Sequence, residues 1–270
     1  MTRILITGMA GSIGSELARQ LAPGNKIFGF DIDETRLYQL REELRNQGHW
    51  VHSKTGDIRN RRSLSDVFED FKPEVVFHTA ALKNVTPSEE YPQEAIDTNI
   101  QGTANLIAEA KRWECLQKFV FISTDKVVNA KCIMGITKKC AEGLVTRAGK
   151  EFVAVRFGNV LGSNGSVLEI WEKQYKQGKP LTITDERMKR YTMSIPEACE
   201  LVIEAQKGKD GEIWILDMGH PEFIVSLMHR LYPNAEYKVV GIREGEALSE
   251  QLMTEEESLL AKKKGKFYIL

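Results

Sequence analysis

The sequence predicts an α/β protein with a doubly wound parallel sheet and a small C-terminal α/β part, and three observations lead to this prediction. Short apolar runs alternate with helical stretches through the first half of the chain, as in repeated βαβ units with right-handed crossovers. The first apolar run, residues 3–7, leads directly into a glycine-rich turn that opens a helix. After residue 158 the alternation becomes less regular, which indicates a second, smaller part.

The predicted elements follow one another with short connections. The strands are expected where apolar runs occur, at residues 3–7, 26–30, 50–55, 73–81, 118–123 and 152–157. The helices are expected after the glycine-rich turn and at about 34–45, 62–71, 92–113 and 134–148. The later part should hold helices near 166–177, 196–207 and 222–231 and strands at 212–216 and 237–240. Residues 1–157 are therefore expected to form a Rossmann domain that binds NAD(P), and residues 158–270 mainly a substrate-binding part interleaved with it.

The composition favours an ordinary cytoplasmic enzyme. The 270 residues include 37 basic and 38 acidic side chains, so no basic excess points to nucleic acid. The apolar runs are far shorter than a bilayer span, and the first residues form a strand rather than a signal peptide. The 4 cysteines show no Cys-x-x-Cys spacing and no nearby histidine cluster, so they are expected to be reduced thiols and no metal site is expected. The run 262–264 of three lysines is expected to be a solvated surface segment.

The glycine-rich turn predicts a dinucleotide site. Gly8, Gly11 and Gly14 permit a tight turn, a close approach of the backbone to a pyrophosphate, and close packing of the helix on the strand. Asp31 ends the second predicted strand about 20 residues farther on, where a carboxylate accepts the adenosine ribose 2′-hydroxyl. The alternative is a structural strand–turn–helix without a ligand.

A second group of candidate residues follows the fifth predicted strand. Thr124, Asp125 and Lys126 lie at the strand's carboxyl end, where open α/β sheets bind ligands. Met134 and Lys138 are four residues apart, so they share one face of a helix. A Tyr–Lys pair at this spacing would transfer a proton, whereas a thioether carries none. Proton transfer would therefore depend on Asp125, Lys126, Lys138 or the substrate. The alternatives are a surface Asp–Lys pair, and Met134 as core packing beside a solvated Lys138.

Eight segments in chain order carry a family resemblance. They are residues 7–17, 80–83, 99–103, 123–126, 134–138, 155–163, 190–198 and 241–246. Together they resemble the UDP-N-acetylglucosamine 4,6-dehydratases, in the polysaccharide-biosynthesis branch of the extended short-chain dehydrogenases. The resemblance runs from residue 3 to about residue 257. Some members of that branch also carry Met in place of the active-site Tyr, so Met134 is a mark of a subtype and not proof of a dead enzyme.

The resemblance implies a lyase that removes water across C5 and C6 of a UDP-hexose. The C5–H bond is acidic only while C4 is a ketone, so a hydride would be lent to NAD(P)⁺ and returned to C6. The resemblance makes Asp125 the acid for the C6 hydroxyl and Lys126 the base for the C5 proton. Burial is then expected to raise the pKa of Asp125 and to lower that of Lys126. Thr124 would bind the C4 hydroxyl and Lys138 the nicotinamide ribose, with Met134 as pocket wall. The acceptor of the C4 hydroxyl proton stays open, with the Asp125 carboxylate as the first candidate.

The resemblance also implies two sets of binding residues and a homodimer. The cofactor is expected to be NAD, with NADP as the alternative, and the positions implied for it are Thr7, Gly8, Gly11, Ser12, Ile13, Gly14, Asp31, Asp57, Ile58, Ala80, Ala81, Lys83, Asn99 and Lys138. Those implied for the UDP-sugar are Lys83, Asn159, Ser163, Ser166, Arg190 and Arg243, the arginines being suited to a diphosphate. Arg190 has an alternative role as a surface ion-pair residue. The dimer would form through the helices at 92–113 and after Met134, where Ala95, Ile96, Ile100, Leu106 and Ala110 recur at helical spacing although some must face the sheet.

The chain departs from the family pattern around the substrate, and it is shorter than typical members. Asn84, Thr86, Asn164 and Ala247 replace residues usual in the branch, which leaves the exact sugar less secure than the reaction. Two other functions remain open. One is a sugar-nucleotide C4 epimerase or reductase, which needs no acid–base pair at 125 and 126. The other is a non-catalytic dinucleotide-binding protein.

Overall fold

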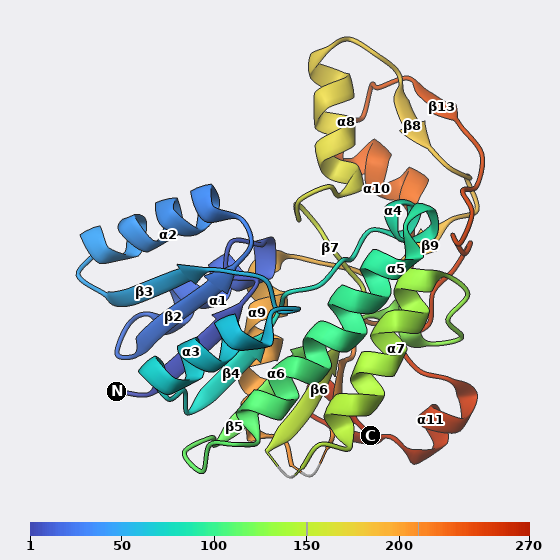
Figure 1. Cartoon of the computed structure of the whole chain (residues 1–270). Coiled ribbons are helices and arrows are strands. Elements are labelled where there is room, and N and C mark those ends of the chain that lie inside the picture. Colours follow the sequence, from blue (N-terminus) through green and yellow to red (C-terminus); the bar gives the residue numbers. More distant parts are fainter. Residues whose placement is uncertain (150, 210) are drawn as a thin grey trace.

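The computed structural model describes residues 1–149, 151–209 and 211–270, and in these a nine-stranded sheet forms the centre of the molecule (Figure 1). The strand order is β14-β15-β11-β6-β5-β4-β1-β2-β3. The strands from β11 to β3 are parallel to one another, whereas β15 is antiparallel to β11 and β14 is antiparallel to β15. The strand bounds are β1 (Arg3–Thr7), β2 (Lys26–Asp31), β3 (Trp50–Thr55), β4 (Val75–His78), β5 (Lys118–Ile122), β6 (Phe152–Arg156), β11 (Ile213–Leu216), β14 (Lys262–Lys264) and β15 (Phe267–Ile269). The prediction of a doubly wound parallel sheet is confirmed.

Two hydrophobic cores lie on the two faces of this sheet. One core packs apolar side chains of α1 (Ser12–Leu21), α2 (Glu34–Asn46) and α9 (Ile195–Glu204) against the strands. The other packs α3 (Arg61–Phe71), α6 (Thr103–Ala110) and α7 (Ile133–Thr146) against the opposite face. Each helix buries one stripe of side chains, which is why the helical spacing of apolar residues was visible in the sequence.

The expected helix at 92–113 is a composite segment. It consists of α5 (Pro92–Ala95), a π-helix η1 (Ile96–Gly102) and α6, which ends at Ala110. The π-helix carries Asn99, and wide turns of this kind are frequent at functional sites.

The chain after residue 158 contributes to both the main sheet and a separate lobe. Helix α9 and strands β11, β14 and β15 join the main sheet or cover it. The lobe above the sheet has its own core, formed by Trp171 and other apolar residues of α8 (Val167–Lys176), β8 (Leu181–Ile183) and α10 (Ile224–Leu231). Three short strand pairs complete this part: β7 (Asn159–Val160) with β10 (Thr192–Met193), β9 (Lys189–Arg190) with β12 (Glu222–Phe223), and β8 with β13 (Tyr237–Val239).

Several elements differ from the sequence-based expectation. The strand expected at 73–81 ends at His78, and the next residues form a loop. The helix expected at 222–231 begins at Ile224, because the two residues before it pair with β9. The lysine run is exposed, as expected, but it forms edge strand β14, and charge on an edge strand opposes pairing with another chain. Helices α4 (Val85–Glu90) and α11 (Glu255–Leu260) were not expected, and neither were the two-residue strands, which are too short to show a pattern.

Candidate functional site

A cavity of about 990 Å³ runs from the glycine-rich turn, along the carboxyl ends of the parallel strands, to the C-terminal lobe. Most residues predicted for the site line this cavity. They are Gly8, Gly11, Ser12, Ile13, Gly14, Asp31, Asp57, Ile58, Ala80, Ala81, Lys83, Thr124, Lys126, Met134, Lys138, Asn159, Ser163, Ser166 and Arg243. The four that do not are Thr7, Asn99, Asp125 and Arg190.

The glycine-rich turn has the close approaches that its glycines predicted. Gly8 has a φ of +72°, and a Cβ atom there would lie 2.6 Å from the backbone nitrogen of Ala80. A Cβ at Gly14 would lie 2.2 Å from the Gly8 carbonyl oxygen. These distances exclude any side chain, so the turn packs closely on itself and on the loop after β4. The turn and the first residues of α1 also line the cavity.

Asp31, at the end of β2, accepts two backbone hydrogen bonds. Its Oδ2 accepts a hydrogen bond from the Ala10 backbone nitrogen at 2.8 Å, and its Oδ1 accepts from the Asp33 nitrogen at 2.9 Å. The carboxylate therefore holds the glycine-rich turn while it also borders the cavity.

Thr7 and Asn99 lie behind the cavity wall, which corrects their assignment as cofactor contacts. Thr7 is fully buried, and its Oγ1 is 2.8 Å from Nδ1 of His78. Asn99 binds both backbone groups of Leu82, at 2.9 Å each, and its Nδ2 donates to Thr137 Oγ1 at 3.0 Å. Asn99 thus joins the loop after β4 to helix α7, both of which carry cavity residues.

Lys126 contacts three polar side chains near the end of β5. It lies in the 3₁₀ turn η2 (Asp125–Val127) after β5. Its Nζ is 3.0 Å from Asp125 Oδ1, 3.1 Å from Asn159 Oδ1 and 3.0 Å from Glu250 Oε1. Although burial alone would lower the pKa of Lys126, the two carboxyl groups raise it above its usual value.

Asp125 does not line the cavity itself, but it is hydrogen-bonded to two residues that do, Thr124 and Lys126. Its side chain is fully buried, and its Oδ1 accepts hydrogen bonds from Lys126 Nζ and, at 2.9 Å, from Thr124 Oγ1. Burial alone would raise the pKa of Asp125, but Lys126 and the hydrogen bonds of Glu250, Lys126 and Thr124 lower it. The expected directions for Asp125 and Lys126 are therefore both wrong in this state, because the two side chains form an ion pair. Thr124 lines the cavity and connects it to Asp125.

Glu250 is a site residue that the sequence analysis missed. Its side chain is only 8% exposed, and burial raises its pKa to about 7. It lies 124 residues after Lys126 in an irregular segment, so no spacing or periodicity connects the two. The only signal was its place four residues after the segment 241–246, which had been recognised by resemblance.

Arg190 lies beyond Glu250 instead of on the cavity wall. Its Nε is 3.4 Å from Glu250 Oε1, and its Nη1 donates to the Lys189 carbonyl at 2.8 Å. Only 6% of the residue is exposed. Arg190 is therefore corrected from a substrate contact to a buried partner of Glu250, and its alternative role as a surface ion pair is also wrong.

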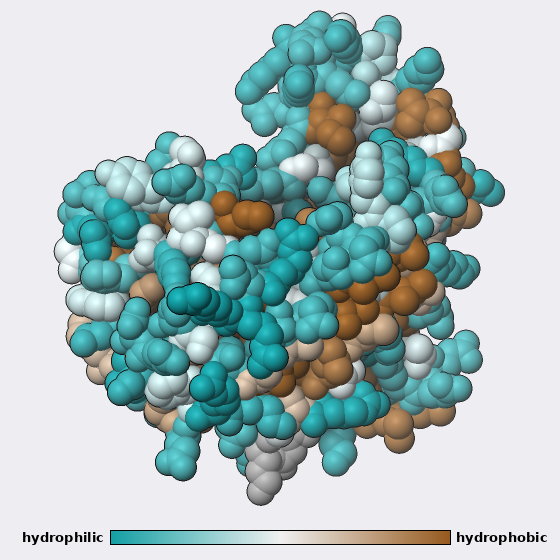
Figure 2. Space-filling model, in the orientation of Figure 1, coloured by the Kyte–Doolittle hydropathy of each residue, from teal (hydrophilic) through white to brown (hydrophobic). Residues whose placement is uncertain are grey.

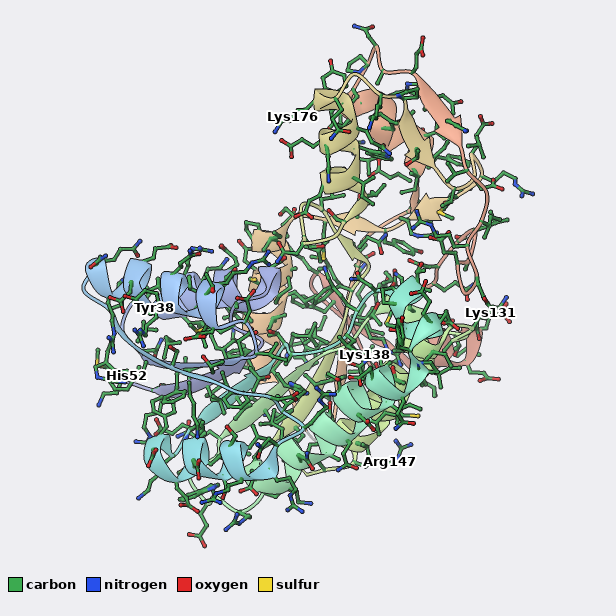
Figure 3. All side chains as sticks on the ribbon, turned by 45° about the horizontal axis from the view of Figure 1, so that its top comes forward. Tyr38, His52, Lys131, Lys138, Arg147 and Lys176 are labelled. Atoms are coloured by element: carbon green, nitrogen blue, oxygen red, sulfur yellow. The ribbon has the colours of Figure 1, made fainter. Side chains whose placement is uncertain are left out.

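Met134 and Lys138 line the cavity from one face of α7. Met134 is 2% exposed. Lys138 lies inside the molecule, whereas Lys176 projects from α8 (Figure 3). The Lys138 Nζ donates to the Ile122 carbonyl oxygen and lies 4.0 Å from the centroid of the Phe121 ring. Burial lowers its pKa to about 7, because few groups compensate the ammonium charge.

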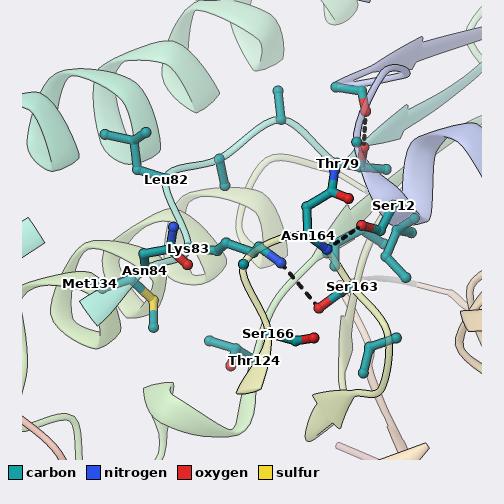
Figure 4. Close-up of a pocket in the computed structure, with 18 of the residues that line it drawn as sticks. Ser12, Thr79, Leu82, Lys83, Asn84, Thr124, Met134, Ser163, Asn164 and Ser166 are labelled. Atoms are coloured by element: carbon teal, nitrogen blue, oxygen red, sulfur yellow. Dashed lines mark hydrogen bonds between the residues drawn. The ribbon is translucent and has the colours of Figure 1, made fainter. Parts of the chain in front are cut away.

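A loop after β7 lines the cavity and is hydrogen-bonded to two other parts of its wall (Figure 4). The Asn164 backbone nitrogen donates to Ser12 Oγ at 2.9 Å, and Lys83 Nζ donates to Ser163 Oγ at 3.2 Å. Ser166 Oγ is buried and has no hydrogen-bond partner in the part of the chain that the structure describes. The loop therefore bridges the glycine-rich turn and the loop after β4, and it offers hydroxyl groups to a ligand.

The described ranges hold neither a candidate metal site nor a candidate membrane-spanning helix. Residues 1–149, 151–209 and 211–270 contain no group of three or more His, Cys, Asp or Glu side chains arranged to hold a metal ion. Within the same ranges, no helix has the length and apolar character needed to cross a membrane.

Comparisons with known proteins find relatives along almost the whole chain. A family model described as polysaccharide biosynthesis protein matches residues 4–270. The capsular polysaccharide biosynthesis protein CapD of Staphylococcus aureus is 42% identical over 94% of this chain, which spans only 45% of that protein. An inverting UDP-N-acetylglucosamine 4,6-dehydratase of Campylobacter jejuni is 33% identical over 99% of this chain and 82% of its own length. A UDP-glucose 4-epimerase of Rickettsia bellii is also 33% identical, over 98% of this chain and 81% of its own.

A solved structure has nearly the same fold. Pen from Bacillus thuringiensis superimposes with a TM-score of 0.93 and is 34% identical, covering 98% of this chain and 88% of its own.

Proposed function

Because this chain belongs to the polysaccharide biosynthesis protein family, we propose that it is an NAD-dependent 4,6-dehydratase of a UDP-sugar, with UDP-N-acetylglucosamine as the substrate. The product would be the UDP-4-keto-6-deoxy-N-acetylhexosamine, an intermediate for surface polysaccharide or rare amino-sugar synthesis. The observation that carries this proposal is that Thr124 and Lys126 line the cavity beside Lys138, while Asp125 is hydrogen-bonded to both of them. Elimination of water needs an acid and a base at one place, and this group supplies both.

The cofactor site fits a dinucleotide. The glycine-rich turn lines the cavity, and the first turn of α1 offers its N–H groups to a pyrophosphate. The Asp31 carboxylate suits a ribose 2′-hydroxyl and repels a 2′-phosphate, which favours NAD over NADP. Bound NAD⁺ would supply the hydride chemistry, that is, the oxidation of C4 and the later reduction of C6 with the same hydride.

The residues around the sugar would divide the two proton transfers of the water elimination among them. Lys126, as the neutral amine, takes the proton from C5. Asp125, as the carboxylic acid, donates a proton through the Thr124 hydroxyl, which is 2.9 Å from its Oδ1 and faces the cavity. That proton leaves with the C6 hydroxyl as water. Lys138 would contact the nicotinamide ribose, and Met134 would form an apolar wall in place of the phenol.

The UDP moiety would lie beneath the loop after β7. Ser163, Ser166 and Asn159 offer polar groups there, and Arg243 supplies the cation for the diphosphate. Asn84, Thr86 and Asn164, which depart from the family pattern, line the same cavity and would set the choice of sugar.

A homodimer through α5, η1 and α7 is the proposed assembly. Figure 2 shows apolar atoms gathered over α5 and α7, and Ile96, Ile136 and Leu144 are 39%, 45% and 41% exposed. Ala95, Leu106 and Ala110, which the sequence also suggested for the interface, are fully buried in the protomer and are corrected to core residues. The exposed isoleucines and leucine form a surface that a second copy would cover.

The test is incubation with UDP-N-acetylglucosamine in deuterated water without added NAD(P)H. The dehydratase releases a 4-keto-6-deoxy product with solvent deuterium at C5. A C4 epimerase, the alternative favoured by the Rickettsia relative, gives only the 4-epimer without C5 deuterium, and that result refutes the proposal. No turnover of any UDP- or GDP-sugar would favour a non-catalytic binding protein.

A further inference from the structure

Two buried carboxyl groups share one lysine in this site. The Lys126 Nζ has three oxygen partners, from Asp125, Glu250 and Asn159, each at 3.0 to 3.1 Å. An ammonium group has three donor hydrogens, so these partners use all of them. The second oxygen of each carboxyl group, Asp125 Oδ2 and Glu250 Oε2, is buried and has no hydrogen-bond partner within the described ranges.

The two carboxyl groups are close to each other, because each has an oxygen 3.0 Å from the same lysine nitrogen. Two ionised carboxylates offer each other only acceptors, because neither has a hydrogen to donate. One proton held between Asp125 and Glu250 would supply a donor for the orphaned oxygens. This is the expected state of two carboxyl groups that are close together in a buried site.

The hydrogen bonds and charges around Asp125 and Glu250 favour the proton on one of the two carboxyl groups. Asp125 accepts hydrogen bonds from Thr124 and Lys126, and these stabilise its ionised form. Glu250 is largely desolvated, and the nearby Asp125 carboxylate opposes its ionisation, although Lys126 and Arg190 favour it. Tyr191, the remaining titratable neighbour of Asp125, has a pKa raised by burial and by Asp125, so it stays neutral. The proton therefore belongs mainly to Glu250.

We propose that Glu250 is a positioning residue whose retained proton allows one proton shift, from Lys126 to Asp125, to create the base and the acid of the dehydration together. The shift takes place along the 3.0 Å hydrogen bond between Lys126 Nζ and Asp125 Oδ1. It leaves a neutral amine, a neutral Asp125 acid and a neutral Glu250, so no new unpaired charge is buried. This inference rests on the proposed dehydratase function.

Ionisation of Glu250 would stop the same shift. Its carboxylate, 3.0 Å from the lysine nitrogen, would stabilise the ammonium form of Lys126. The turnover number kcat should then fall at alkaline pH, by about tenfold per pH unit once Glu250 ionises. A lysine base without such a neighbour gives the opposite trend, because its active amine form increases with pH.

Infrared spectroscopy tests the protonated state without substrate. In protein labelled with ¹³C-carboxyl glutamate, a protonated glutamic acid gives an isotope-shifted carbonyl band that ionised carboxylates lack. We expect this band at pH 6 and its loss as the pH passes through neutrality. Absence of the band at pH 6 overturns the inference, and no variant has to fold for this measurement.

The pH profile of kcat tests the consequence. Glu250→Gln carries an amide that donates a hydrogen bond to Asp125 and never ionises, so the alkaline fall and the infrared band should both disappear. Glu244→Gln is the matched control, because Glu244 is exposed in the same segment, and it should keep both. An alkaline fall that persists unchanged in Glu250→Gln overturns the inference.

The two experiments separate this inference from the proposed function. A protein that shows the glutamic acid band but dehydrates no UDP-sugar refutes the proposed function and, with it, the catalytic consequence. A protein that dehydrates the sugar and lacks the band refutes the role of Glu250 alone.

Discussion

Replacing Lys138 by Met should change how the stability of the free protein depends on pH. Lys138 is 6% exposed, and burial lowers its pKa from 10.5 to about 7. Between these two values the unfolded chain binds the proton and the folded protein does not. The free energy of unfolding should therefore rise with pH through this window, and the destabilisation from the buried ammonium should be fully present below about pH 7.

The size of the effect follows from the same values. A pKa that falls from 10.5 to about 7 corresponds to at most about 5 kcal/mol, of which about 2 kcal/mol is recovered between pH 7 and pH 9. Met has a similar shape and no charge at any pH. The variant loses the hydrogen bond to the Ile122 carbonyl, but that cost does not depend on pH.

The assay is urea denaturation of the wild type and of Lys138→Met from pH 6 to pH 9. The advantage of the variant over the wild type should shrink by about 2 kcal/mol between pH 7 and pH 9. Lys131→Met is the control, because Lys131 is exposed, and its stability should run parallel to that of the wild type. Parallel curves for Lys138→Met as well would show that the Lys138 ammonium is not penalised by burial, and the reasoning would be refuted.

Further predictions concern the reaction, the cofactor and the assembly. Asp125→Asn and Lys126→Ala should each lower kcat by about 10² or more, the usual cost of a lost general acid or base, as steady-state kinetics would show. Met134→Leu should lower kcat far less, because a volume-conserving swap costs under about 1.5 kcal/mol. If it lowers kcat as much as Asp125→Asn does, the sulfur has a role in the reaction. If only Met134→Tyr is active, the parent is a binding protein. Calorimetry should find tighter binding of NAD than of NADP, with less discrimination in Asp31→Ala, and the reverse preference would contradict the assigned ribose contact. Light scattering should find a dimer that Ile136→Glu converts to a monomer, whereas a monomeric wild type at micromolar concentration removes the proposed interface.

Local patterns in the sequence predicted the sheet and the cofactor side of the site. Gly8 and Gly14 lie just after the first strand, and Asp31 is the last residue of the second strand, so a few neighbouring residues were enough for this prediction. Lys126 and Lys138 were also found this way, because both are close in sequence to the end of β5.

The remainder of the site depends on contacts between distant segments. Glu250 meets Lys126 only because the segment after β13 folds back over the end of β5, and nothing local predicts that path. Arg190 also contacts Glu250, and it does not line the cavity. Asn99 was assigned to the cofactor because its motif is near the site, but its three hydrogen bonds, to Leu82 and Thr137, use the side chain for support. The expected rise in the pKa of Asp125 and the expected fall in that of Lys126 were wrong for a related reason. They considered burial alone, whereas the ion pair between the two side chains shifts both pKa values the other way.

The fate of hydrogen at C4 of the sugar tests the central claim most directly. Purified protein would be incubated with UDP-N-acetylglucosamine that carries deuterium at C4, in ordinary water, and the product examined by mass spectrometry and NMR. The proposed reaction moves that deuterium to C6 of a 4-keto-6-deoxy sugar and places solvent hydrogen at C5. Deuterium retained at C4 of an epimerised sugar, or lost to added cofactor, would contradict the proposed 4,6-dehydration.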